Sequence, residues 1–443
     1  MFGTSGIRGI YGKEITEELA MRIANIFASD ALAVGRDTRV SGPALRDAVA
    51  NGVLAAGADF IDLGIVPTPT VALANRKHGC RAIMITASHN PPEYNGLKLM
   101  ENTKEIGKEL EKEITASYRK GESALKRAEV AGKKKHDEAI LADHRNLVMG
   151  LVDGGLIGKR KPKIVVDCNG AAAVITPALL TELGCRVIPV NCGLEGFARP
   201  PEPNRKNLGH LPALVKETGA DFAIAHDGDG DRCVIFDETG AMLEFDAQLA
   251  MMIEHELDRS GAKEKNKKIV TTVEASLAIR GVVEKVGGAI DITPVGSTFV
   301  ADRMEADNGL FGGEPCGEYI YRDGVHVPDA VLAAAKFAEI FCQKGPFSKL
   351  KTRYPQHFMA REKFQAKDKH GTVIHVKEGI AALGIQGKVR DDDGIRVDEE
   401  DGWFLVRASG TEPIVRLTME YMTREGLEKR KNEMELLIKR SLV

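Results

Sequence analysis

Three aspartates that alternate with glycines form the most distinctive stretch of this 443-residue sequence, residues 227–231 (DGDGD), which Arg232 follows directly. Residues two apart in an extended backbone point to one side, and the intervening glycines permit a tight curl around an ion. Clustered carboxylates repel one another unless a cation lies among them, and hard oxygen ligands in this number suit Mg²⁺. We therefore predict one magnesium ion bound by Asp227, Asp229 and Asp231.

Two other interpretations of the aspartate stretch are open. An EF-hand loop fits Glu238 at its twelfth position, but it requires glycine at the sixth, where Arg232 stands. The sequence on both sides is strand-like, whereas an EF-hand is flanked by helices. A solvated acidic loop is the second alternative, although such loops rarely place acids with this period between two apolar strands.

A serine stands where another predicted strand ends. The apolar run 82–85 (AIMI) predicts a buried strand, and residues 86–92 (TASHNPP) follow it. Open α/β sheets bind ligands beyond the carboxyl ends of their strands. The alternative is an ordinary turn in which Ser88 only caps a helix. We favour a functional loop, with Ser88 and His89 as candidate catalytic residues, because the sequence contains further segments suited to anions.

Three further segments carry groups suited to an anion or to sugar hydroxyls. In segment 3–9, glycines, hydroxyls and Arg8 allow close approach to an anion, unless the segment is only a flexible turn. Segment 311–319 places carboxylates and an aromatic on a glycine-rich loop, which suits vicinal sugar hydroxyls, although a simple hairpin has the same composition. Segment 407–416 combines two arginines, two hydroxyls and a glycine amide, which match a phosphate dianion better than a polar hairpin does.

Predicted strands and helices alternate over most of the chain, which indicates layered α/β domains with these loops at sheet edges. The stretch 101–145 is charged and predicted to be mostly helical, and 150–163 is predicted to be a linker. After about residue 351 the composition changes, and we expect strands there, one of them at 373–376. The predicted domains are 1–148 (α/β, serine loop), 149–246 (α/β, aspartate loop), 247–350 (α/β, sugar loop) and 351–443 (α+β, phosphate loop).

Composition limits the class of protein. A formal net charge of -3, with 28% charged and 43% hydrophobic residues, offers no general field for nucleic acid. The seven cysteines include no C-x-x-C pair, so we expect neither a disulfide framework nor a zinc site. No apolar run reaches the roughly 18 residues of a membrane span, and no leader precedes Phe2. We expect a cytoplasmic protein that binds neither membrane nor nucleic acid.

The four loops, in this order and at this spacing, resemble the α-D-phosphohexomutase superfamily across the whole chain. The resemblance implies an α/β fold, in which three similar α/β domains with mixed sheets and a smaller, mobile C-terminal α+β domain surround a central cleft. It implies that Ser88 is a phosphoserine whose phosphate oxygen joins the three aspartates in holding Mg²⁺. Lys98 then corresponds to the general acid/base near the transferred group.

The same resemblance assigns the remaining site residues. Arg8, His89 and Arg232 are expected at the catalytic centre, where Arg232 neutralises charge on the transferred group. The expected substrate-binding residues are Glu314, Cys316 and Glu318 for the sugar, and Arg407, Ser409, Gly410, Thr411 and Arg416 for its distal phosphate. The implied reaction interconverts the 6-phosphate and 1-phosphate of a hexose through a bisphosphorylated intermediate. Hexose 1,6-bisphosphate is the expected activator, and the chain is expected to be a monomer or homodimer.

Smaller features bear on which sugar is used. The pair Glu314-Pro315 and the opening segment 2–9 are similar to the phosphoglucosamine mutase branch, so we favour glucosamine 6-phosphate. Cys316 and Glu318 replace the serine and histidine of many members, and segment 296–298 (GST) departs from the usual phosphoglucosamine mutase loop. Glu318 would attract the ammonium group of glucosamine by Coulomb interaction. A phosphomannomutase/phosphoglucomutase is the close alternative, and a non-catalytic sugar-phosphate-binding protein is the alternative from another class.

Overall fold

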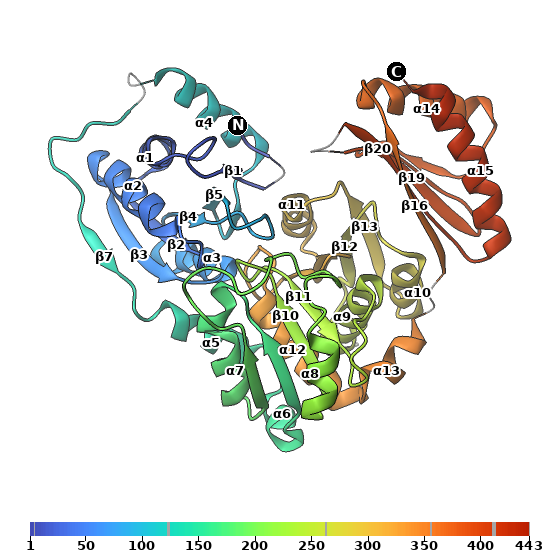
Figure 1. The fold of residues 1–443 in the computed structure, drawn as a ribbon, viewed down its shortest axis with the longest axis horizontal. Helices are drawn as coiled ribbons and strands as arrows, with labels where there is room; N and C mark the ends of the chain where they lie inside the picture. Colours follow the sequence, from blue (N-terminus) through green and yellow to red (C-terminus); the bar gives the residue numbers. More distant parts are fainter. Residues whose placement is uncertain (4, 122–124, 262–263, 355–356, 410–412, 443) are drawn as a thin grey trace.

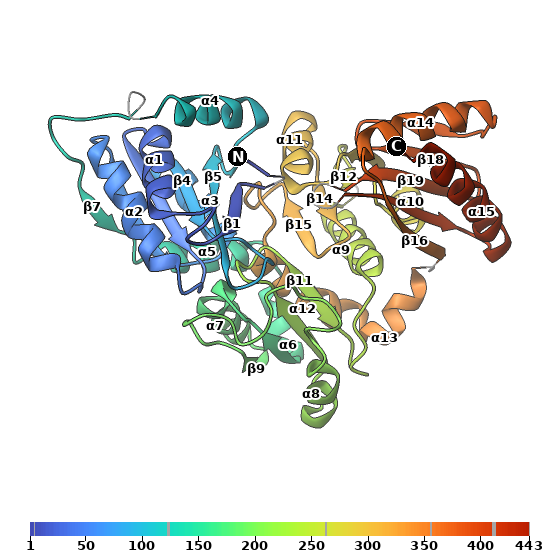
Figure 2. The same cartoon turned by 45° about the horizontal axis from the view of Figure 1, so that its top comes forward.

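The computed structural model describes residues 1–3, 5–121, 125–261, 264–354, 357–409 and 413–442. Four β-sheets follow one another along the chain, and helices pack against them (Figure 1). The first three sheets are mixed and the last is wholly antiparallel, which confirms the predicted fold class. The C-terminal sheet and its two helices form a separate lobe (Figure 2). Within the described ranges, no helix is long and apolar enough to cross a membrane.

The first sheet has seven strands and helices on both faces. The elements of this part are β1 (Ile7–Ile10), α1 (Glu17–Phe27), β2 (Ala31–Arg36), α2 (Gly42–Ala55), β3 (Asp59–Ile65), α3 (Thr68–His78), β4 (Arg81–Ile85), β5 (Tyr94–Glu101), β6 (Lys104–Glu105), α4 (Lys108–Arg119), β7 (Lys134–His136) and α5 (Ile140–Gly150). Side chains of α1, α2 and α4 form the core on one face, and those of α3 and α5 form a second core on the other. Two buried faces explain why the central strands are apolar throughout.

The second and third sheets have four strands each. The elements around the second sheet are α6 (Gly154–Arg160), β8 (Lys163–Asp167), the 3₁₀ turn η2 (Ala171–Val174), α7 (Thr176–Glu182), β9 (Arg186–Val190), α8 (Leu211–Thr218), β10 (Phe222–His226) and β11 (Cys233–Phe236). Those around the third are α9 (Phe245–Ser260), β12 (Lys268–Thr272), α10 (Leu277–Lys285), β13 (Ala289–Thr293), α11 (Ser297–Asp307), β14 (Phe311–Glu314), β15 (Glu318–Tyr321), α12 (Ala330–Lys344), α13 (Phe347–Leu350) and η3 (Lys351–Arg353).

The three mixed sheets share one strand order. In each, a first strand (β2, β8 or β12) lies between two parallel neighbours, the strands that follow it in the chain. A fourth strand (β5, β11 or β15) returns antiparallel to the third. The connection between the third and fourth strands therefore occupies the same place in all three sheets, beyond the carboxyl end of a parallel strand, where open α/β sheets bind ligands.

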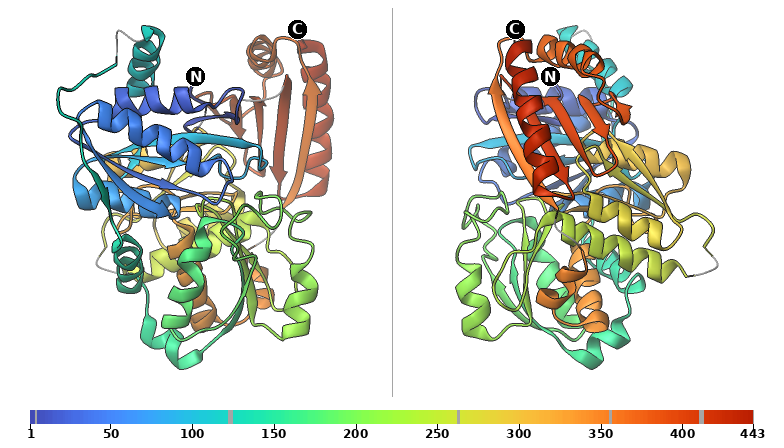
Figure 3. Two further views of the ribbon diagram at one scale, coloured as in Figure 1. Left: turned by 60° about the vertical axis from the view of Figure 1, so that its left-hand side comes forward. Right: turned by 90° about the vertical axis from the view of Figure 1, so that its right-hand side faces the viewer.

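The second and third sheets are not independent bodies, because they share one large hydrophobic core. Helix α12 runs through it and packs against α6, α7 and α9 (Figure 3). Its side chains from Ala330 to Phe341 are buried all round, as expected for a helix inside a core. The domain boundaries given in the sequence analysis remain predictions.

The C-terminal lobe is an antiparallel sheet, in the order β16-β20-β19-β18-β17, with helices packed on one face. Its elements are β16 (Phe358–Gln365), α14 (Lys369–Ala382), β17 (Lys388–Arg390), β18 (Ile395–Asp398), β19 (Gly402–Ala408), β20 (Ile414–Tyr421) and α15 (Arg424–Ser441). Glu420 joins this lobe to the third sheet by accepting hydrogen bonds from Ser276 Oγ at 2.7 Å and the Leu277 N–H at 2.9 Å. The indole N–H of Trp403 donates to the same carboxylate at 2.8 Å.

Three local predictions were wrong. Residues 373–376 lie inside α14 rather than in a strand, because Asp368 caps a helix there through the N–H groups of His370 and Gly371. The predicted linker at 150–163 contains α6, which Asp153 caps. The stretch 101–145 is only partly helical, with β7 at the sheet edge. In each case the local sequence is compatible with more than one secondary structure, and tertiary packing selects one of them.

Candidate active site

Three loops in equivalent positions converge on one cavity. They join β4 to β5, β10 to β11 and β14 to β15, and they carry Ser88, the three aspartates and the predicted sugar loop respectively. The cavity has a volume of about 570 Å³. Among its lining residues are Ser5, Arg8, Ser88, His89, Asp231, Arg232, Glu314, Cys316 and Glu318. The fold thus brings together candidate residues from three sheets.

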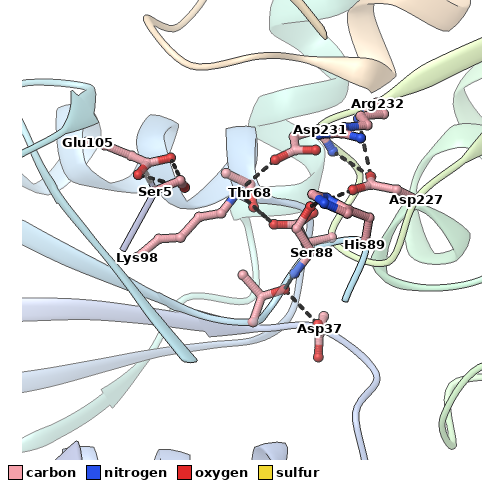
Figure 4. Close-up of polar contacts among 12 residues, drawn as sticks. Ser5, Asp37, Thr68, Ser88, His89, Lys98, Glu105, Asp227, Asp231 and Arg232 are labelled. Atoms are coloured by element: carbon pink, nitrogen blue, oxygen red, sulfur yellow. Dashed lines mark hydrogen bonds and ion pairs between the residues drawn. The ribbon is translucent and has the colours of Figure 1, made fainter. Parts of the chain in front are cut away.

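Ser88 is held in an unusual backbone conformation against the aspartate loop. Its φ is +48°, a left-handed value that is uncommon for residues other than glycine, and its side chain is almost fully buried. Its hydroxyl donates a hydrogen bond to Asp227 Oδ2 at 2.8 Å (Figure 4). The Nδ1 atom of His89 lies 3.3 Å from the same hydroxyl. A strained backbone that is held in place by its surroundings is typical of functional loops.

Arg39, which the sequence analysis did not single out, holds the serine loop by hydrogen bonds to its backbone. Its guanidinium is buried and pairs with Asp37 at 3.0 Å. The carbonyl oxygens that accept hydrogen bonds from its two Nη atoms, at 2.6–2.8 Å, are those of Ser88, Asn90, Pro91 and Tyr94. Every N–H of the guanidinium therefore has an acceptor, and the loop that carries Ser88 is tied to a single rigid fork.

Asp37 also holds the serine loop, through the hydroxyl of Thr86. Its Oδ2 atom accepts a hydrogen bond from the Thr86 hydroxyl at 2.7 Å, and the Thr86 oxygen accepts one from the Ser88 N–H at 2.8 Å. One buried ion pair therefore holds Ser88 at both ends: its carbonyl is bonded directly to Arg39, and its N–H is linked to Asp37 through the Thr86 hydroxyl. The signal in the sequence was the segment 36–39 (RDTR) at the end of β2, which is the parallel neighbour of β4.

The three aspartates fit a bound cation. One carboxylate oxygen from each aspartate lies within 4.8 Å of the corresponding oxygens of the other two. Asp227 Oδ1 accepts the N–H groups of Asp231 and Arg232, both at 3.2 Å. The buried Oδ1 atoms of Asp229 and Asp231 have no hydrogen-bond partner among the described residues. Burial and the neighbouring carboxylates raise the pKa of Asp227. A divalent ion would engage the unpartnered oxygens and relieve this repulsion.

Lys98, on β5, reaches the same carboxylates. Its Nζ atom lies 2.9 Å from Asp229 Oδ2 and 2.7 Å from Asp231 Oδ2, and its side chain is 2% exposed. Burial by itself lowers the pKa of Lys98, but the two carboxylates outweigh burial and raise it well above its ordinary value. The lysine therefore carries a positive charge beside the candidate metal site.

Arg8, in the N-terminal segment, is linked through Ser5 to the buried carboxylate of Glu105, which the sequence analysis missed. Ser5 Oγ donates to both oxygens of Glu105 at 2.9 Å and accepts from Arg8 Nη2 at 3.0 Å. Burial raises the pKa of Glu105, while the charges of Lys98 and Arg8 oppose that rise. Glu105 lies on the short strand β6, and nothing in its local sequence distinguishes it from a surface glutamate.

Arg232 and Glu318 form an ion pair across the boundary between the second and third sheets. Both Nε and Nη2 of Arg232 lie 3.0 Å from Glu318 Oε1. The positive charge of Arg232, together with burial, lowers the pKa of His89 to about 2, so His89 is neutral at neutral pH. A neutral imidazole can accept as well as donate hydrogen bonds.

The sugar loop places two further groups in the cavity. Glu314 accepts a hydrogen bond from the Gly296 N–H at 3.1 Å, and burial with the charge of Glu318 raises the pKa of its carboxyl well above the usual value. Burial also raises the pKa of Cys316 well above that of a free thiol, so Cys316 is not a reactive thiolate. The loop therefore presents a set of groups that can hydrogen-bond hydroxyls.

The described residues of the phosphate loop belong to the C-terminal lobe and do not line this cavity. Arg407 on β19 and Arg416 on β20 are directly opposite each other, and Lys363 on β16 is opposite Arg416. Like charges in such positions are destabilising, so this row favours a bound anion. Arg407 also pairs with Asp393 at 2.8 Å. Ser409 is buried beside them.

The described part of the phosphate loop does not meet the serine loop in that cavity. Arg407, Ser409 and Arg416 are described but do not line the cavity that contains Ser88. Gly410 and Thr411 lie outside the described residues. The distal-phosphate role of this loop stays a prediction.

Family models match four successive parts of the chain. They are "Phosphoglucomutase/phosphomannomutase, alpha/beta/alpha domain I" at residues 1–125, the corresponding domain II at 146–240, domain III at 245–358, and the C-terminal domain at 360–437.

Individual proteins match over nearly the whole chain. A "phosphoglucomutase/phosphomannomutase" of Thermococcus kodakarensis is 38% identical, with 99% of this chain and 98% of that protein covered. A "probable phosphoglucosamine mutase" of Methanopyrus kandleri is 38% identical with the same coverage. The crystal structure of a phosphoglucomutase/phosphomannomutase family protein from Burkholderia thailandensis superposes with a TM-score of 0.87 at 26% identity, covering 99% of this chain and 97% of that one. The chain therefore belongs to the phosphoglucomutase/phosphomannomutase family, the α-D-phosphohexomutases.

Proposed function

We propose that this phosphohexomutase interconverts glucosamine 6-phosphate and glucosamine 1-phosphate through a phosphorylated Ser88. The observation that carries the mechanism is the Ser88 hydroxyl, held 2.8 Å from a buried cluster of three carboxylates. A merely sugar-phosphate-binding protein has no need of a strained serine facing such a cluster. The assignment of glucosamine as the sugar is based on the Glu314-Pro315 pair and on Glu318. A phosphomannomutase/phosphoglucomutase, the name carried by one of the matching proteins, is the alternative.

The proposed reaction transfers a phosphoryl group twice. Phospho-Ser88 donates its phosphoryl group to the free 1- or 6-hydroxyl of the substrate, so the bond from phosphorus to Oγ breaks and a bond to the sugar oxygen forms. The sugar hydroxyl gives up its proton, which Lys98 accepts or relays. The resulting bisphosphate turns around. The bond from its other phosphorus to the sugar oxygen then breaks as a bond to Ser88 Oγ forms, and the proton taken up in the first step returns to that sugar oxygen. Hexose 1,6-bisphosphate, by the same second step, would phosphorylate an enzyme that has lost its phosphate.

Charge at the site supports these roles. Arg8 and Arg232 line the cavity beside Ser88 and can stabilise the transferred group. His89 is neutral and within reach of the serine oxygen, so it can orient the phosphate. Asp229 and Asp231 raise the pKa of Lys98 in the protein alone. A cation bound by these two carboxylates would offset their charge and lower that pKa toward the range useful for proton transfer.

We assign one Mg²⁺ per chain to the aspartate loop. Asp227, Asp229 and Asp231 would hold the ion together with an oxygen of phospho-Ser88, because Mg²⁺ takes oxygen ligands and usually combines a few carboxylates with phosphate or water. Bound there, Mg²⁺ supplies positive charge to the phosphoryl oxygens. The seven cysteines are all free where described, which fits the reducing conditions of a cytoplasm. A monomer or a homodimer is equally compatible with this site.

The test of the mechanism is the intact mass of the protein after incubation with glucose 1,6-bisphosphate and Mg²⁺. We expect the addition of one phosphate, located on Ser88, and its loss when a sugar monophosphate is added in excess. Addition at another residue, or no addition to an active enzyme, would contradict the phosphoserine mechanism.

The sugar preference gives a second prediction. Glucosamine 6-phosphate should be converted with a kcat/KM at least about tenfold higher than mannose or glucose phosphates, equivalent to about 1.4 kcal/mol. Glu318→Gln should reduce this preference, because it removes the negative charge that faces the ammonium group. Cys316→Ser, in the same loop, changes no charge and should leave the preference intact. If mannose or glucose phosphate is the better substrate by tenfold, the assignment of the sugar is wrong.

The phosphate loop gives a third prediction. Arg416→Ala should raise the KM for the sugar monophosphate about 10- to 100-fold, because a charge-assisted hydrogen bond to phosphate contributes about 1.5–3 kcal/mol. Mg²⁺ affinity and the phosphate already on Ser88 should be unchanged, since Arg416 does not line the cavity. Arg407→Ala should behave alike. The control is Arg430→Ala, which breaks an ion pair with Glu399 in the same lobe and should leave KM unchanged. Loss of Mg²⁺ binding in the Arg416 variant would refute the phosphate role.

A further inference from the structure

Helix α3 belongs to the first sheet, but its first turn touches the aspartate loop of the second. Thr68, the first residue of α3, is 1% exposed. Its hydroxyl donates a hydrogen bond to Asp229 Oδ2 at 2.8 Å, and its backbone N–H donates to the Asp229 carbonyl at 2.9 Å. One residue of the first domain therefore holds both the side chain and the main chain of a candidate metal ligand in the second.

The two oxygens of Asp229 have different surroundings. Oδ2 accepts from the Thr68 hydroxyl and also lies 2.9 Å from Lys98 Nζ. Oδ1 is buried and has no hydrogen-bond partner among the residues that the structure describes. Donors that converge on one oxygen fix the rotation of the carboxylate, so that the other oxygen faces the space between the aspartates.

We infer that Thr68 is a positioning residue for the metal site, which turns Asp229 Oδ1 toward the ion; this inference rests on the proposed metal role of Asp229. Lys98 shares the task in the protein alone, but in the proposed reaction it also handles the proton of the sugar hydroxyl. Thr68 has no such second role, so its hydrogen bond can persist through the reaction. Together with the bond from Ser88 to Asp227, it aligns the serine of the first domain with the metal ligands of the second.

The same helix offers a matched control. Thr70 is also buried, and its hydroxyl lies 2.7 Å from His144 Nδ1. The other ring nitrogen of His144 lies 3.0 Å from Asp329 Oδ2, at the start of α12. Thr70 therefore makes a buried hydrogen bond between distant parts of the chain, as Thr68 does, but its partners are not metal ligands.

The test measures metal binding rather than turnover. Dephosphorylated protein is titrated with Mn²⁺, followed by electron paramagnetic resonance, and Mg²⁺ is then used as a competitor. We expect Thr68→Val to raise the Kd for Mn²⁺ about 10- to 100-fold, the usual effect of losing an outer-shell partner. Thr68→Ser keeps the hydroxyl and should bind close to the wild type. Thr70→Val should lower the thermal unfolding midpoint and leave the Kd unchanged.

Two results would overturn the inference. The first is wild-type Mn²⁺ affinity in Thr68→Val. The second is an equal loss of affinity in Thr70→Val, which would trace the effect to the docking of α3 rather than to the Thr68 hydroxyl. If Thr68→Val does not fold, Thr68→Ala compared with Thr68→Ser makes the same distinction. Failure of the metal site itself looks different: the wild type would then bind Mn²⁺ no better than Asp229→Asn does.

Discussion

Ser88→Ala protein is expected to lose mutase activity by at least about 10⁴-fold, the scale of removing a catalytic nucleophile. Without the hydroxyl no phosphoenzyme forms, and neither half of the reaction can proceed. Incubation with glucose 1,6-bisphosphate should leave the mass of this variant unchanged, whereas the wild type gains one phosphate. A coupled assay for the sugar 1-phosphate, together with intact mass, measures both effects on the same samples.

The control for this variant is Ser41→Ala. The Ser41 hydroxyl accepts a hydrogen bond from Asn95 near the serine loop and is not bonded to the aspartates. Its loss should leave activity and phosphorylation close to those of the wild type. Should Ser88→Ala turn over at the wild-type rate, the phosphoserine mechanism would have to be abandoned, whatever the variant's affinity for sugar phosphates.

Arg39→Met is expected to lower the free energy of unfolding by about 3–5 kcal/mol, because it removes one partner of a fully buried ion pair and leaves Asp37 uncompensated. It also removes the donors to three carbonyl groups of the serine loop and to that of Tyr94, the first residue of β5. The remaining folded protein should therefore take up phosphate on Ser88 more slowly. Denaturant unfolding measures the first effect, and the time course of intact mass measures the second.

Arg46→Met is the matched control, since it also breaks arginine–carboxylate contacts in the first domain. Arg46 pairs with Asp47 at 2.7 Å and Asp62 at 3.3 Å, but these side chains are partly exposed. Its loss should cost less than about 1 kcal/mol. Equal destabilisation by the two substitutions would mean that the buried interactions of Arg39 contribute no more to stability than a partly exposed ion pair does.

Much of the site could be predicted because its reactive groups lie close together within short segments of the sequence. The aspartates alternate with glycines, and the serine follows an apolar strand, so residue type and spacing alone indicate a metal site and a displayed nucleophile. Segment 373–376 was predicted wrongly as a strand, because a short β-branched run is compatible with both strand and helix.

Other residues of the site could not be predicted, because their importance comes only from their partners. Glu105 and Thr68 are ordinary residue types in ordinary local sequence, and the position of Arg39 just beyond β2 places it near the site without showing which carbonyl groups it binds. Each becomes significant through burial: Arg39 under the serine loop, Glu105 beneath Ser5 and Arg8, and Thr68 against Asp229. Burial of a polar group without a partner is costly, so the partner rather than the residue reveals the role.

The amino-acid sequence by itself determined which chemical groups are available and that strands and helices alternate, because both depend on residue type and on local periodicity. Only the tertiary structure decided which groups meet. Ser88 and Asp227 are 139 residues apart, Thr68 and Asp229 are 161 apart, and Arg232 and Glu318 are 86 apart. These contacts arise because three sheets share one strand order and meet at the equivalent edge, and such packing depends on the register and burial of whole sheets rather than on any short segment.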